Sequence, residues 1–167
     1  MADKYLYNNS GTITEKAAIT TSAGAGDAGK IPAVDGTGRF DSSFMPVGLG
    51  ADTASITASE ALAAGDLVNI WNSTGAKVRK ADASTAGKEA HGFVLSAVSS
   101  SATALVYFEG TDTQVSSLTP GVQFLSTTPG IASATAPSGS GNIVQRVGYA
   151  AAATALNFDA GTPIVLA

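Results

Sequence analysis

Short runs of β-forming residues, each ended by a turn signal, recur through residues 51–167. Residues 67–71 (LVNIW) and 103–108 (TALVYF) are largely apolar, and residues 77–81 (KVRKA) alternate between polar and apolar side chains as a half-exposed strand does. Roughly ten strands at 8–12-residue spacing are typical of a β-sandwich or β-barrel. We therefore expect a mainly β fold whose body is a compact antiparallel β-barrel or β-sandwich, β-tulip-like or jelly-roll-like.

Some segments of this body are predicted in more detail. Residues 91–99 are expected to be a longer apolar strand and residues 142–149 another strand, and residues 131–134 are expected to pair with residues 122–125. Helix is limited to single turns at 59–64 and 85–90. The core is expected to contain large apolar residues from most of the strands: Ile56, Leu67, Ile70, Val78, Phe93, Leu95, Leu105, Tyr107, Phe124, Ile143, Val147, Phe158 and Val165.

The composition restricts the kind of partner and site. Only 13% of the residues are charged, against about 25% in an ordinary soluble domain, so we expect a surface covered by partners or dominated by small residues. The net charge of −4 argues against nucleic-acid binding. The chain has no cysteine, which excludes disulfides and cysteine metal sites. No apolar run of about 18 residues is present, so no membrane span is expected.

Residues 1–50 differ from the rest of the chain. Residues 20–29 (TTSAGAGDAG) are a low-complexity joint. Residues 29–50 (GKIPAVDGTGRFDSSFMPVGLG) contain prolines and Asp-Gly and Thr-Gly turn signals, which predict an extended strap with one tight reversal. We therefore divide the chain into an extended N-terminal arm, residues 1–50, with little regular structure and at most one short strand, and a β-barrel or β-sandwich domain, residues 51–167.

The strap carries large apolar side chains, which a solvated linker avoids. Such a segment has to place those side chains against another surface. The sequence therefore predicts that the strap lies on a neighbouring protein subunit.

Two motifs are candidates for chemistry. Residues 24–30 (GAGDAGK) match the GxxxxGK spacing of a phosphate-binding loop. However, Ile31 stands where such a loop has a serine or threonine that binds magnesium, and Pro32 blocks the helix that should follow. His91 is the only histidine, it begins an apolar run, and no GxSxG signature accompanies it. We expect neither nucleotide binding nor catalysis by His91.

The remaining polar groups support the same interpretation. The carboxylates are scattered, with Asp35, Asp41, Asp52 and Asp66 at turn positions, and no EF-hand spacing is present. Lys77, Arg79, Lys80 and Lys88 form a basic cluster, which fits a solvated strand face or a contact with an acidic neighbour. Trp71, the single tryptophan, fits a core or interface anchor better than a sugar-stacking platform. We expect no enzyme, no cofactor, no metal and no small-molecule substrate.

Three segments carry a resemblance to a known group of proteins. They are the opening MADKYLYNNSGTITE, the strap GKIPAVDGTGRFDSSFMP, and the body ASEALAAGDLVNIWNSTGAKVRKADAS with AHGFVLSAVSSSATALVYFEG. Together they cover most of the chain, and they resemble the capsid decoration proteins of tailed bacteriophages, also described as cement or head-fibre-like proteins. Pieces of the strap also resemble tail-fibre and tail-associated proteins.

The resemblance implies a structural virion protein on the outer surface of the capsid. It implies a homotrimer with a β body and an N-terminal arm that runs over the major capsid protein, clamping its subunits against internal DNA pressure. The alternative is a tail or fibre component that mediates attachment or host adsorption. The arm residues expected to anchor on the partner are bulky and apolar: Tyr5, Leu6, Tyr7, Ile13, Ile31, Pro32, Phe40, Phe44, Met45 and Pro46.

Overall fold

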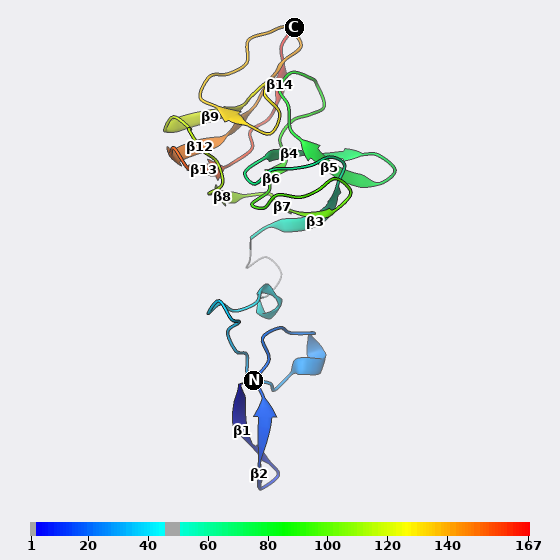
Figure 1. The fold of residues 1–167 in the computed structure, drawn as a ribbon, viewed down its shortest axis with the longest axis vertical. Coiled ribbons are helices and arrows are strands. Elements are labelled where there is room, and N and C mark those ends of the chain that lie inside the picture. Colours follow the sequence, from blue (N-terminus) through cyan, green and yellow to red (C-terminus); the bar gives the residue numbers. More distant parts are fainter. Residues whose placement is uncertain (1–2, 46–50) are drawn as a thin grey trace. The chain divides into compact units, whose positions relative to one another are not determined.

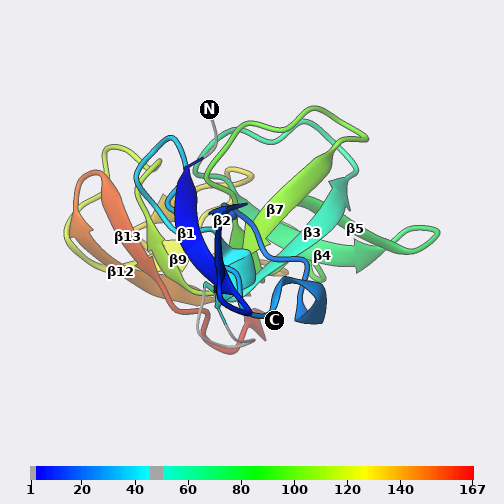
Figure 2. The same cartoon turned by 90° about the horizontal axis from the view of Figure 1, so that it is seen from below.

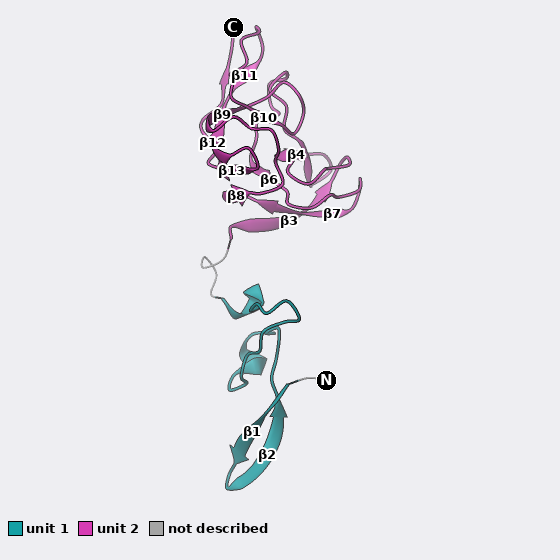
Figure 3. Ribbon diagram, turned by 60° about the vertical axis from the view of Figure 1, so that its left-hand side comes forward, with its two compact units in different colours: residues 1–50 teal, residues 51–167 magenta. Residues whose placement is uncertain are grey.

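A computed structural model describes residues 3–45 and 51–167, and in it the chain divides into unit 1, Met1–Gly50, and unit 2, Ala51–Ala167 (Figure 3). Strands dominate both units. Among the described residues, no helix has the length and apolar character needed to cross a membrane.

One half of unit 2 is a closed five-stranded barrel. Its strands are β3 (Thr53–Ala58), β4 (Leu67–Asn72), β5 (Ala76–Lys80), β6 (Gly92–Phe93) and β7 (Thr103–Tyr107). They follow one another around the barrel in the order β3-β5-β4-β6-β7. The β3–β5 pair is parallel and every other pair is antiparallel.

The other half of unit 2 is an open antiparallel sheet in the order β10-β9-β12-β13-β8 (Figures 1 and 2). Its strands are β8 (Gly110–Asp112), β9 (Gly121–Leu125), β10 (Ala132–Ser133), β12 (Arg146–Ala152) and β13 (Ala155–Phe158). The strands β11 (Ile143–Val144) and β14 (Ile164–Val165) form a separate two-stranded ribbon. The predicted fold class, mainly β with a barrel-like or sandwich-like body, is confirmed.

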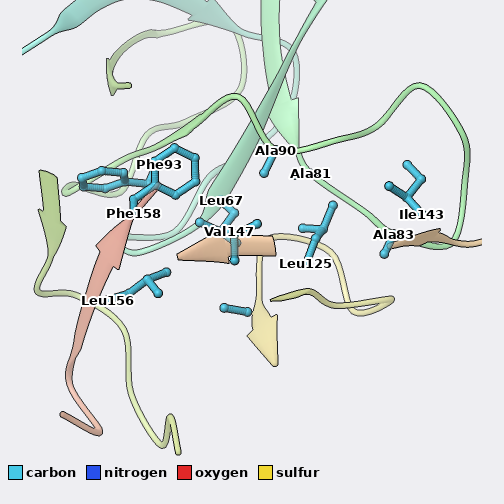
Figure 4. Packing of buried hydrophobic residues seen from close by; sticks show 11 residues of the cluster. Leu67, Ala81, Ala83, Ala90, Phe93, Leu125, Ile143, Val147, Leu156 and Phe158 are labelled. Carbon is cyan, nitrogen blue, oxygen red and sulfur yellow. The ribbon is translucent and has the colours of Figure 1, made fainter. Parts of the chain in front are cut away.

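Unit 2 is held by two apolar clusters. Successive side chains of a strand point to opposite faces, so Leu67 and Val68 on β4 enter different clusters, as do Phe93 and Val94. Val68 and Val94 pack in the cluster built from barrel strands. Leu67 and Phe93 pack in the larger cluster with side chains of the open sheet (Figure 4). The Phe93 ring also stacks on Tyr107 at 5.4 Å between ring centroids.

The prediction of burial is wrong for two residues of the expected core, Leu105 and Val165. Leu105 is 46% exposed because its neighbours Ala104 and Val106 on β7 face the barrel interior, which turns Leu105 outward. Val165 is 54% exposed in the two-stranded ribbon, whereas its ribbon partner Ile143 is buried. Six of the predicted core residues are buried, namely Leu67, Val78, Phe93, Ile143, Val147 and Phe158. The other five are half-buried: Ile56, Ile70, Leu95, Tyr107 and Phe124.

The longer strand predicted at 91–99 is wrong in its extent, and the strand predicted at 142–149 forms with one interruption. Only Gly92–Phe93 of the segment 91–99 is a strand, because the chain then pairs irregularly with residues 62–66, through hydrogen bonds such as that from the Val94 N–H to the Asp66 carbonyl. The segment 142–149 is split into β11 and the start of β12 at Gln145. No helix forms at 59–64 or 85–90.

The side chain of Gln145, at this interruption, is buried and makes three hydrogen bonds. Its Oε1 accepts the Ala90 N–H at 2.7 Å, and its Nε2 donates to the carbonyls of Ala90 and Gly161 at 2.9 and 3.2 Å. Through these three hydrogen bonds the buried amide of Gln145 holds the segment around Ala90 onto the open sheet.

Unit 1 contains more regular structure than predicted. The strands β1 (Lys4–Asn9) and β2 (Thr12–Ala17) form a six-pair antiparallel hairpin, so the expectation of at most one short strand was wrong. Two single 3₁₀ turns follow, at Ala25–Asp27 and Ser42–Phe44. None of residues 3–45 is buried, whereas unit 2 has two buried clusters.

Candidate interaction surface

The hairpin of unit 1 is specified by its turn. The two loop residues, Ser10 and Gly11, both have positive φ, at 53° and 93°, which is the type I′ geometry that matches the twist of the flanking strands. The side chain of Asn8 accepts the Gly11 N–H at 2.8 Å and closes the turn. Because the turn fixes the register, it also fixes which side chains share a face.

That register divides the predicted hairpin anchors between two faces. Leu6 and Ile13 share one face, where they are 75% and 62% exposed. Tyr5 and Tyr7 share the other, where the Lys16 ammonium lies 4.7 Å from the centre of the Tyr7 ring. The Tyr5 hydroxyl is covered by the chain itself. Leu6 and Ile13 are therefore the most accessible apolar surface of the hairpin.

The loop after the hairpin is closed by Asp27. Its carboxylate accepts the Ala23 N–H and the Lys30 ammonium, each at 2.6 Å, and the Lys30 hydrogen bond is the main reason that the pKa of Asp27 is lowered. This loop contains the GxxxxGK spacing discussed above. A carboxylate of the loop itself takes the amide and ammonium groups with which a phosphate would have to bond.

The strap that follows is shaped by two further aspartates. Asp35 accepts hydrogen bonds from the Thr37 hydroxyl at 2.6 Å and from the N–H groups of Thr37 and Arg39, and these bonds lower the pKa of Asp35. Asp41 accepts from Ser43, which lowers the pKa of Asp41 in the same way. These short-range Asx turns give the strap its reversals without a core.

The predicted strap anchors are accessible. Ile31, Pro32, Phe40 and Met45 are exposed. Phe44 is half-buried and meets the edge of the Phe40 ring at 6.3 Å between centroids. Pro46, the last predicted anchor, lies outside the described residues.

One exposed apolar residue of the strap was missed. Val34 is exposed beside the predicted anchors Ile31 and Pro32. The signal that could have identified it is its place in the strap, between a proline and the Asp-Gly turn. With it, unit 1 supplies seven of the thirteen exposed large apolar residues in the described chain: Leu6, Tyr7, Ile13, Ile31, Val34, Phe40 and Met45.

The charges of unit 1 are largely engaged within the unit. Lys4 pairs with Glu15 at 2.6 Å, Lys30 pairs with Asp27, and Lys16 lies over Tyr7. The surface that remains for a partner is therefore apolar side chains and backbone rather than free charge.

His91 has a structural contact. Its Nδ1 accepts the N–H of Ile70 at 3.0 Å, and its Nε2 lies 3.9 Å from Glu89 Oε1. Within the described ranges, no group of three or more histidine or acidic side chains could hold a metal ion.

Three of the four side chains of the basic cluster, those of Arg79, Lys80 and Lys88, make contacts within unit 2. The Arg79 guanidinium lies 4.6 Å from the centre of the Trp71 ring and donates to Asn69 and Gly87. Lys80 pairs with Asp66 and Lys88 with Asp82. Trp71 is half-buried and its Nε1 donates to the Ser59 hydroxyl at 3.2 Å, so it acts as a packing residue in unit 2.

The buried carboxyl of Asp112 was not singled out from the sequence. It is fully buried on β8, where its Oδ1 accepts the Gln114 N–H at 2.9 Å and its Oδ2 has no partner. Burial raises the pKa of Asp112, and the nearby charge of Asp66 raises it further. Gln114 and Asp66 also line a small pocket of about 240 Å³ together with Gly65 and Gly130.

Compared with protein-family models, with curated proteins and with solved structures, the chain has no significant match.

Proposed function

We propose that this protein is a capsid cement protein of a tailed bacteriophage. Unit 1 attaches to the major capsid protein on the outside of the head, and unit 2 is the compact body. The protein acts as a homotrimer, so that several copies of unit 1 clamp neighbouring capsid subunits against the pressure of the packaged DNA.

One observation carries this proposal. Residues 3–45 have no buried side chain, yet they hold seven of the thirteen exposed large apolar residues in the described chain. A two-stranded hairpin alone is at best marginally stable in water, and isolated apolar side chains gain about 25 cal/mol per Å² when a partner covers them. Unit 1 is therefore suited to an interface with another protein.

Unit 2 supports the same division of roles. It contains both apolar clusters and all of the buried residues among those described. A body with its own core remains folded whether or not unit 1 is bound. Three linked attachment segments also bind far more tightly than one, because each later contact forms at a high effective concentration.

The test is a variant that lacks residues 1–50. We expect it to unfold at the same temperature as unit 2 in the full chain, and to lose binding to purified phage heads that carry no decoration protein. Co-sedimentation with the heads measures binding, and calorimetry confirms that the body is folded. Binding that survives the deletion would contradict the proposal.

A second measurement addresses the position on the virion. Gold-labelled antibody against unit 2 should mark the surface of the head in electron micrographs. Labelling confined to the tail would instead identify a tail or fibre component.

A further inference from the structure

The hydrogen bonds of the hairpin show which backbone groups point outward. The Ala18 N–H donates to the Asp3 carbonyl at 2.8 Å, so these two residues form a hydrogen-bonded pair. Such pairs alternate along an antiparallel ladder with pairs whose N–H and C=O groups face away from each other. From the register, the outward-facing groups on β1 are those of Lys4, Leu6 and Asn8.

The outer edge of β2 is already in use at one end. Continuing the alternation, the backbone groups of Ile19 point outward from the β2 side, and they bind the strap: the Ile19 N–H donates to the Ile31 carbonyl at 3.1 Å, and the Ala33 N–H donates to the Ile19 carbonyl at 2.8 Å. Among the described residues, no strand pairs with the outer edge of β1.

We infer that the outer edge of β1 is the docking edge for an extended strand of another polypeptide. The partner strand adds to the hairpin through the backbone groups of Lys4 and Leu6, which is β-augmentation. This inference rests on the proposed function, in which that polypeptide is the major capsid protein.

The surroundings of the edge define the chemistry of the partner strand. The Leu6 side chain lies at the centre of the edge, and Ile13 lies diagonally across on the same face, both highly exposed. The nearest charges are neutralised within the hairpin, because Lys4 pairs with Glu15 at 2.6 Å. The edge therefore fits an uncharged strand with apolar side chains, and its binding depends little on salt.

Two substitutions of outward-facing residues provide a matched test in the full-length protein. Leu6→Pro removes an outward N–H of β1, and Ala17→Pro removes an outward N–H of β2, while neither removes a hydrogen bond of the hairpin ladder. Ala17→Pro also leaves the Lys4–Glu15 ion pair in place. On undecorated phage heads we expect Leu6→Pro to weaken binding at least about tenfold and Ala17→Pro to change it less than about twofold. Leu6→Thr, which keeps the N–H, should lie between them.

Hydrogen exchange of the wild-type protein gives a readout without any substitution. On binding to heads, exchange of the Leu6 amide should slow at least about tenfold, and exchange of the Glu15 amide should not.

The inference is overturned if the Leu6 amide gains no protection, or if Leu6→Pro binds normally. It is also overturned if Leu6→Pro lowers the oligomeric state of the free protein in sedimentation, because the occupant is then a second copy of this chain. Absence of binding by the wild type would instead refute the proposed function.

Discussion

At the scale of single residues, Asp112 makes the stability of unit 2 sensitive to pH. Its carboxyl is fully buried with one oxygen unpartnered, and burial raises the pKa of Asp112 above the ordinary value of 3.8. The folded protein therefore holds this proton more tightly than the unfolded chain does. The stability that this group contributes is fully present below pH 3.8 and is lost as the pH rises through the raised pKa.

The substitution Asp112→Asn should remove this loss. The amide keeps an oxygen for the Gln114 N–H and carries no charge at any pH. The free energy of unfolding, measured in urea between pH 4 and 8, should increase for the variant relative to the parent as the pH rises. The two values should be closest at pH 4. A difference between the two proteins that does not change with pH would contradict the assignment.

Such buried polar residues could not be found from the sequence. Asp112 stands in a polar stretch that resembles a solvated strand face. Gln145 stands among apolar residues, but its partner Ala90 lies 55 positions away in the chain. Only the three-dimensional pairing determines that these side chains are buried. The exposure of Leu6, Ile13 and Phe40 was easier to predict, since they stand in short segments that lack enough apolar residues for a core.

At the scale of elements, Gly148 allows β12 to pair on both sides. It lies at a bulge in the pairing with β9, has a φ of 137°, and a Cβ there would come within 2.0 Å of the Asn157 carbonyl oxygen on β13. Only glycine fits both the conformation and the close approach.

We therefore expect Gly148→Ala to lower the free energy of unfolding by about 3 kcal/mol, with a range of 2–4. Gly161→Ala is the control, because its φ is not positive and its nearest neighbour lies at an ordinary 3.4 Å. It should cost less than about 1 kcal/mol. Equal effects in chemical denaturation would show that the bulge has no special requirement for glycine.

The sequence predicted where most strands lie, but it predicted fewer of the residues at which the strands begin and end. The runs at 67–71 and 103–108 match β4 and β7 closely because alternation and flanking turns are local properties. The hairpin β1–β2 was missed, although Ser10-Gly11 is a two-residue turn signal, because its strands carry few apolar side chains. The parallel β3–β5 pair and the barrel closure depend on long-range pairing that local patterns do not contain.

At the scale of the whole molecule, the two units should differ sharply in resistance to proteolysis. Unit 1 has no buried residue among 3–45, so local opening costs little there, whereas cleavage of unit 2 requires opening of a buried cluster. Trypsin should cut first after Lys30 or Arg39 and leave a stable fragment that contains residues 51–167. Mass spectrometry of a time course measures the order of cleavage. Early cuts within β5, after Lys77, Arg79 or Lys80, would contradict this prediction.

The turns of unit 1 that are closed by aspartates affect how tightly this unit can bind a partner. Asp27, Asp35 and Asp41 each bind backbone amides no more than four residues away, so neighbouring groups hold these turns. A segment that is already bent in solution loses less conformational freedom when it reaches its target than a random coil would. More of the contact energy then remains to slow the dissociation of a partner that the strap binds.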